Sequence, residues 1–132
     1  MATTKKTTLD DLIQKKLQMD ERPKTFDITV GGVTLTFTAV TDDEIFEWLA
    51  DVRTDNLDNA AEVMQTMYQQ TKHLAYMHCE LLREYAAQNP PEGEPWDVLE
   101  ELFDIAERNE LYGAIMDKTG ITRMLGSNAK NR

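Results

Sequence analysis

The chain has little of the chemistry on which many enzymes and secreted proteins depend: its 132 residues include one cysteine, one serine and two histidines. A single cysteine cannot form an internal disulfide, and this usage is typical of a reducing compartment. The sequence has no apolar run of the ~18 residues that a membrane-spanning helix needs, and no signal peptide is recognisable near residue 1. We therefore expect a cytoplasmic protein without membrane contact.

Positive charge is also scarce, since 14 Lys and Arg stand against 24 Asp and Glu and give a formal net charge of −10. Basic residues are in excess only over residues 1–25 and 117–132. The acidic middle lacks the basic face that nucleic-acid binding requires. We expect one domain over residues 8–121, with a flexible N-terminus at 1–7 and a flexible basic tail at 122–132. The alternative is that the basic ends contact an acidic surface.

Two alternating stretches on either side of Gly31 and Gly32 predict a β-hairpin, because a two-residue glycine loop is typical of such tight turns. This register points the apolar side chains of both strands to one face, and two strands alone need a cover for that face. The predicted cross-strand pairs are Val30 with Val33, Ile28 with Leu35, and Phe26 with Phe37.

A capped helix follows the hairpin at once. Thr41 and Glu44 have the spacing of a capping box, and Val40 and Ile45 that of a hydrophobic staple. The helical apolar face behind this cap includes Trp48. We expect this helix to cover the hairpin and to form a nucleus with it.

The rest of the chain predicts further amphipathic helices. A short helix over residues 9–19, capped by Thr8, either docks on the body or stays mobile until something binds. One long helix is expected over residues 57–88, ended by the prolines of 90–95. A helix from Pro95 or Trp96 onward, a kink near Asn109 and a last helix over residues 111–119 complete the prediction. Gly120 is expected as its left-handed cap, with Ile121 touching Met116. The fold class is therefore α+β and mostly α: a short helix, one two-stranded antiparallel hairpin, then three to four helices.

The search for catalytic or metal-binding chemistry finds few candidates. On one helix His73 and His78 would lie about 140° apart, so they could not bind one metal ion. We expect His78 to be a packed core histidine and Cys79 an inert thiol. Lys72 is expected on the solvated side of the long helix. The acidic residues between Asp97 and Glu107 are expected to form a solvated face. We predict no catalytic site, no cofactor and no metal.

The order of these elements resembles that of phage tail assembly chaperones of the PBSX-like (XkdN-like) family. The resemblance covers roughly residues 8–121. The motifs that carry it are Leu9-Asp-Asp-Leu12, Arg22-Pro-Lys-Thr-Phe26, Val30-Gly-Gly-Val33, Thr41-Asp-Asp-Glu-Ile-Phe46 and Asp117-Lys-Thr-Gly-Ile121. It implies a non-enzymatic assembly factor that binds the helical tape-measure protein and keeps it soluble while tube subunits polymerise around it. Such a factor works in the cytoplasm of the bacterial host and is absent from the mature virion.

A client chaperone of this kind needs adaptable apolar contact area together with net charge. The tape-measure protein is the expected partner, while contact with the tail tube protein and homo-oligomerisation stay open. The residues expected to bind the partner are Val63, Met64, Met67, Leu74 and His78, although the same side chains would also suit a core. The alternatives are a structural tail or connector subunit that is retained in the particle, and a small regulatory enzyme or metal protein.

Overall fold

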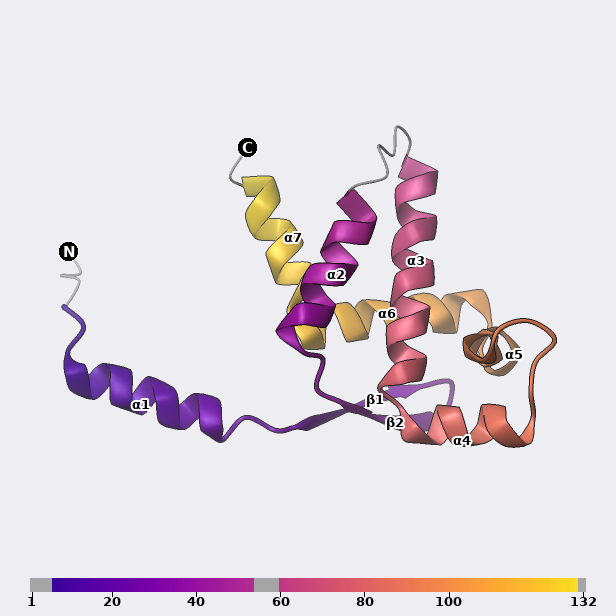
Figure 1. Ribbon diagram of the computed structural model, residues 1–132, viewed down its shortest axis with the longest axis horizontal. Coiled ribbons are helices and arrows are strands. Elements are labelled where there is room, and N and C mark those ends of the chain that lie inside the picture. Colours follow the sequence, from indigo (N-terminus) through magenta and orange to yellow (C-terminus); the bar gives the residue numbers. More distant parts are fainter. Residues whose placement is uncertain (1–5, 54–59, 131–132) are drawn as a thin grey trace.

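The structure, a computed structural model, describes residues 6–53 and 60–130 (Figure 1). The predicted fold class is confirmed: the chain is mostly helical and has one two-stranded antiparallel hairpin. The predictions for residues 1–5, 54–59 and 131–132 lie outside the described residues. The elements are α1 (Leu9–Asp20), β1 (Thr25–Val30), β2 (Val33–Thr38), α2 (Asp42–Arg53), α3 (Ala60–Met77), α4 (Glu80–Gln88), the 3-10 helix η1 (Pro95–Asp97), α5 (Val98–Leu102), α6 (Ile105–Thr119) and α7 (Ile121–Lys130).

The hairpin has the predicted register, with Val30 opposite Val33 and Phe26 opposite Phe37. Gly31 and Gly32 have φ of 58° and 81°, a left-handed conformation that glycine adopts without strain. The inner apolar side chains of both strands are buried, but Val33, beside the turn, is 45% exposed. The turn itself is covered on one side, since a Cβ on Gly31 would meet the side chains of Glu107 and Phe103.

The cover of the hairpin comes from late in the chain, so the expected nucleus of hairpin and α2 is wrong. Side chains from α4, α5 and α6, among them Leu82, Leu99 and Ile115, bury the apolar face of the sheet. α2 belongs to a second core, where Trp48 and Leu49 pack with Leu74 of α3 and Ile121 at the start of α7. The predicted capping box of α2 is still present. The Thr41 hydroxyl accepts a hydrogen bond from the backbone N–H of Glu44 at 3.2 Å, and the Glu44 carboxylate accepts one from the backbone N–H of Thr41 at 3.1 Å.

The long helix predicted over residues 57–88 is wrong, because the chain breaks between α3 and α4. The carbonyl of His78 accepts a hydrogen bond from the backbone N–H of Thr38 at 2.8 Å, and Cys79 has extended backbone. β2 thus takes the hydrogen bond that would have continued the helix.

The second half of the chain also breaks where the sequence did not indicate it. α5 ends at Leu102, Phe103 is extended, and Asp104 caps α6 by accepting a hydrogen bond from the backbone of Glu107 at 2.8 Å. α6 continues through Asn109, so the predicted kink is wrong. Gly120 is the expected left-handed cap, with φ of 88°. Residues 122–130, expected as a loose tail, continue as part of α7.

Candidate functional site

An open groove of about 480 Å³ lies between α3 and α6. Its walls are mostly apolar, and three of its lining residues are methionines, whose unbranched side chains adapt to irregular surfaces. At its rim Met64 is 69% exposed and Ile105 is 58% exposed. The lining residues are Met64, Gln65, Met67, Tyr68, Thr71, Ile105, Asn109, Tyr112, Gly113 and Met116.

Two tyrosines form a rigid wall of the groove. The rings of Tyr68 and Tyr112 meet edge to face, with centroids 4.9 Å apart. Arg108 fixes Tyr68 by donating from Nε to its hydroxyl and from Nη1 to the carbonyl of Phe103. The Tyr112 hydroxyl is buried beside Tyr68 and makes no hydrogen bond of ordinary geometry within the described residues. Burial raises the pKa of Tyr112, so its hydroxyl stays protonated and can serve as a donor.

Gly113 lines the groove from the interior of α6. Glycine costs about 0.5–1 kcal/mol relative to alanine in a helix interior. A Cβ at Gly113 would meet no atom within 4 Å, so nothing in the described part of the chain requires a glycine here. A missing side chain on an open apolar wall lets another backbone approach closely.

The five residues predicted to bind the partner lie in three different places. Met64 and Met67 line the groove. Leu74 is buried in the second core and Val63 packs against other members of that core, because this side of α3 faces α2. His78 lies in a hydrogen-bonded junction. The predicted surface is therefore not one continuous patch, and its α6 half was missed although Ile105, Tyr112 and Met116 repeat at helical spacing.

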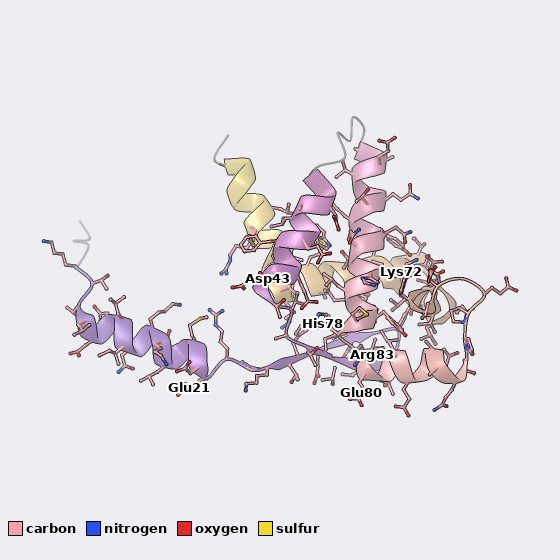
Figure 2. All side chains as sticks on the ribbon, in the orientation of Figure 1. Glu21, Asp43, Lys72, His78, Glu80 and Arg83 are labelled. Atoms are coloured by element: carbon pink, nitrogen blue, oxygen red, sulfur yellow. The ribbon has the colours of Figure 1, made fainter. Side chains whose placement is uncertain are left out.

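The His78 junction ties three elements together. The imidazole Nδ1 lies 2.8 Å from the Thr38 hydroxyl, and Nε2 lies 2.5 Å from Oε2 of Glu44. Glu44 uses its other oxygen in the cap of α2. The Thr38 hydroxyl, the His78 imidazole and the Glu44 carboxylate lie in the order of an acyl-transfer triad. The same contacts, however, join β2 to the break between α3 and α4, and that break to α2. Figure 2 shows His78 where α3 meets the hairpin.

The remaining ligand-type side chains do not converge. His73 packs edge to face on Trp96, with ring centroids 4.6 Å apart, whereas His78 lies in the turn after α3 and contacts Glu44. Cys79 is fully buried, and burial raises the pKa of its thiol, which keeps it protonated and unreactive. Among residues 6–53 and 60–130, no three His, Cys, Asp or Glu side chains could hold a metal ion together.

Lys72 is buried and not on a solvated face as predicted. The acidic residues between Asp97 and Glu107 are mostly exposed, as predicted, but two of them reach Lys72. The Lys72 side chain is 3% exposed, and its Nζ lies 2.7 Å from Asp97 and 2.9 Å from Glu100. Burial alone would lower the pKa of Lys72, but the two carboxylate hydrogen bonds outweigh it and raise that pKa. The hydrogen bond from Lys72 lowers the pKa of Asp97. This cluster joins α3 to η1 and α5 and is labelled at Lys72 in Figure 2.

Comparisons of the chain with protein-family models, with curated proteins and with solved structures found no match. None of the helices in the described ranges has both the length and the apolar character to cross a membrane.

Proposed function

We propose that this chain is a non-enzymatic assembly chaperone of a phage or phage-like tail, and that it holds an amphipathic helix of the tape-measure protein in the α3–α6 groove. The observation that carries the proposal is the groove itself: an open, mainly apolar surface on a chain with a strongly acidic body. Amphipathic helices bind in grooves of this kind through apolar side chains at helical spacing.

The lining of the groove suits a client with a variable apolar face. Met64, Met67 and Met116 can repack around side chains of different shape. Gly113 leaves room for a client backbone. The net charge of −10 would keep a complex with an aggregation-prone client in solution. We infer action in the host cytoplasm and absence from the mature virion, in keeping with the resemblance of the sequence to tail assembly chaperones.

Co-expression with the neighbouring tape-measure protein tests this function. We expect the wild-type chain to raise the soluble fraction of the client, and Met64→Asp to lose that effect because it places a charge in the groove. Leu81→Asp is the matched control, since Leu81 is similarly exposed, at 58%, but lies on α4 outside the groove. If the Met64 variant solubilises the client as well as the control does, the groove is not the client site.

A structural tail or connector subunit is the second candidate, and α1 favours it. α1 buries no residue and extends away from the rest of the described chain, as an arm that orders on assembly would (Figure 1). Mass spectrometry of mature particles separates the two functions. Abundant peptides of this chain would support the structural subunit, and their absence would support the chaperone.

A further inference from the structure

α1 is an amphipathic helix without a partner in the described chain. Its apolar stripe is about half exposed or more at every position, and none of its residues is buried. Figure 1 shows α1 apart from all other helices. A helix of 12 residues is marginal in water unless its apolar face is covered. The stripe consists of Leu9, Leu12, Ile13, Leu17 and Met19.

The α3–α6 groove matches this stripe in length. From Leu9 to Met19 the stripe extends ~15 Å along α1, at 1.5 Å per residue. From Ile105 to Met116 the groove extends ~16 Å along α6 by the same measure. Gly113 lies between these ends and allows the backbone of a docked helix to come close.

Charges beside the two surfaces are complementary. Glu110 and Asp117 are exposed on α6, each next to a groove residue, and neither forms an ion pair within the described chain. Lys15 flanks the stripe of α1, whereas Lys16 lies between Leu9 and Leu12 in projection and pairs with the exposed Asp20 of its own helix. Docking would place Lys15 against an acidic margin, which favours and orients association.

The connection to β1 leads α1 away from its own groove. The carbonyl of Lys24 accepts a hydrogen bond from the backbone N–H of Ala39 at 3.0 Å, which anchors the chain at the start of β1. Only Glu21, Arg22 and Pro23 remain to turn the helix, a span of about 10 Å at most, and the proline ring restricts it further. A second molecule can meet α1 without any such turn.

We propose that α1 of one molecule docks in the α3–α6 groove of a second copy, with the two molecules exchanging arms reciprocally. The contact buries the α1 stripe and the exposed rim at Met64 and Ile105. The arm then occupies the groove that a client would use, so client and self-association compete. That competition rests on the proposed function, whereas the self-association does not.

Sedimentation velocity of the full chain over a range of concentrations tests the exchange. We expect a dimer at high concentration that dissociates on dilution. Leu12→Asp in the arm and Met64→Asp in the groove should each raise the dissociation constant by about tenfold or more, because each places a charge in the apolar contact. The control Leu81→Asp should dimerise like the wild type. An equimolar mixture of the two disrupted variants should form a heterodimer, since one intact arm then meets one intact groove.

Gly113→Ala provides a second test of the groove if Leu12→Asp or Met64→Asp fails to fold. We expect its thermal midpoint to rise, because alanine favours the helix, and its dimer to weaken. A wild-type chain that stays monomeric overturns the inference, as does a dimer insensitive to Leu12→Asp and Met64→Asp or a mixture that fails to associate. A monomer whose α1 amides resist hydrogen exchange also overturns it, since α1 then docks on its own chain. If client solubilisation fails while the dimer responds as expected, only the proposed function is overturned.

Discussion

α1 and α2 begin in the same way and end in different environments. Each has 12 residues and is preceded by a threonine whose side chain forms a capping box with an acid three residues on. α1 buries none of its residues, whereas α2 buries Ile45, Trp48, Leu49 and Val52. The comparison shows that local capping decides where a helix starts, but that packing depends on what the rest of the chain brings to its apolar face.

Two features of α2 explain its burial. Trp48 supplies a large apolar surface, and its indole N–H donates to the Thr71 hydroxyl at 3.2 Å, so its one polar atom is satisfied inside the core. α3 and α7 also stand beside α2 (Figure 1), with Leu74 and Ile121 completing the cluster. The apolar side chains of α1 are all Leu, Ile or Met, without an aromatic ring, and no described element lies beside it.

The largest expected difference between α1 and α2 comes from replacing one apolar residue in each helix by alanine. Trp48→Ala should lower the free energy of unfolding by about 3–5 kcal/mol, since it leaves a cavity and removes the indole hydrogen bond to Thr71. Leu12→Ala should change it by less than about 0.5 kcal/mol, because an exposed side chain loses little. Urea denaturation at protein concentrations below self-association measures both. A similar loss for the two variants would show that α1 is packed.

Ion pairs allow a second test, since α3 and α1 each carry a lysine bonded to carboxylate. Lys72 is buried against Asp97 and Glu100, while Lys16 and Asp20 are 77% and 57% exposed. Lys72→Met should destabilise the chain by about 1–3 kcal/mol, a value reduced because the two carboxylates still reach water. Lys16→Met is the control and should leave the unfolding curve unchanged. If Lys72→Met left the free energy of unfolding unchanged, the attraction within the buried ion pair would only balance the cost of its desolvation.

The sequence predicted the features that depend on near neighbours. Hairpin register follows from alternation and the two glycines, and the starts of α1 and α2 follow from threonine and an acid at fixed spacing. Gly120 ends α6 for the same kind of reason. In each of these features both interacting residues lie near each other in the sequence.

The sequence-based predictions are wrong where a residue that is distant in the sequence forms a hydrogen bond or an ion pair with a residue of the helix. The break at His78 exists because Thr38 of β2 bonds its carbonyl and its ring, which no helical periodicity encodes. Lys72 lies at a polar position of the α3 pattern, and only Asp97 and Glu100, brought over by η1 and α5, make its burial acceptable. The groove combines α3 with α6, so a sequence pattern on either helix gives half of it.

A third test compares the two caps. Thr41→Ala should cost about 1 kcal/mol of unfolding free energy, because it removes an acceptor for the backbone of Glu44 in a packed helix. Thr8→Ala removes the equivalent cap of α1 but should not move the global transition. Thermal unfolding with matched circular dichroism checks both: the Thr8 variant should lose only helical signal in the native baseline. A shift of its midpoint equal to that of the Thr41 variant would contradict the comparison.

The smallest expected effect concerns pH. Burial tends to raise the pKa of Glu44, but hydrogen bonds from His78 and Thr41 outweigh it and hold the pKa below its ordinary value of 4.5. A lowered carboxyl pKa stabilises the fold above the unfolded pKa, and the stabilisation disappears as pH falls through the folded pKa. The stability difference between wild type and Glu44→Gln should therefore shrink from about pH 6 to about pH 3.

Asp11→Asn is the matched variant for this last test, because Asp11 has the same place in the cap of α1. Its unfolding free energy should follow that of the wild type at every pH, since α1 contributes no buried residue to the cooperative core. Denaturation at several pH values gives both differences. A constant gap between wild type and Glu44→Gln across this range would mean that the bonds of Glu44 to His78 and Thr41 do not stabilise its charged form, and that α2 owes its place to apolar packing alone.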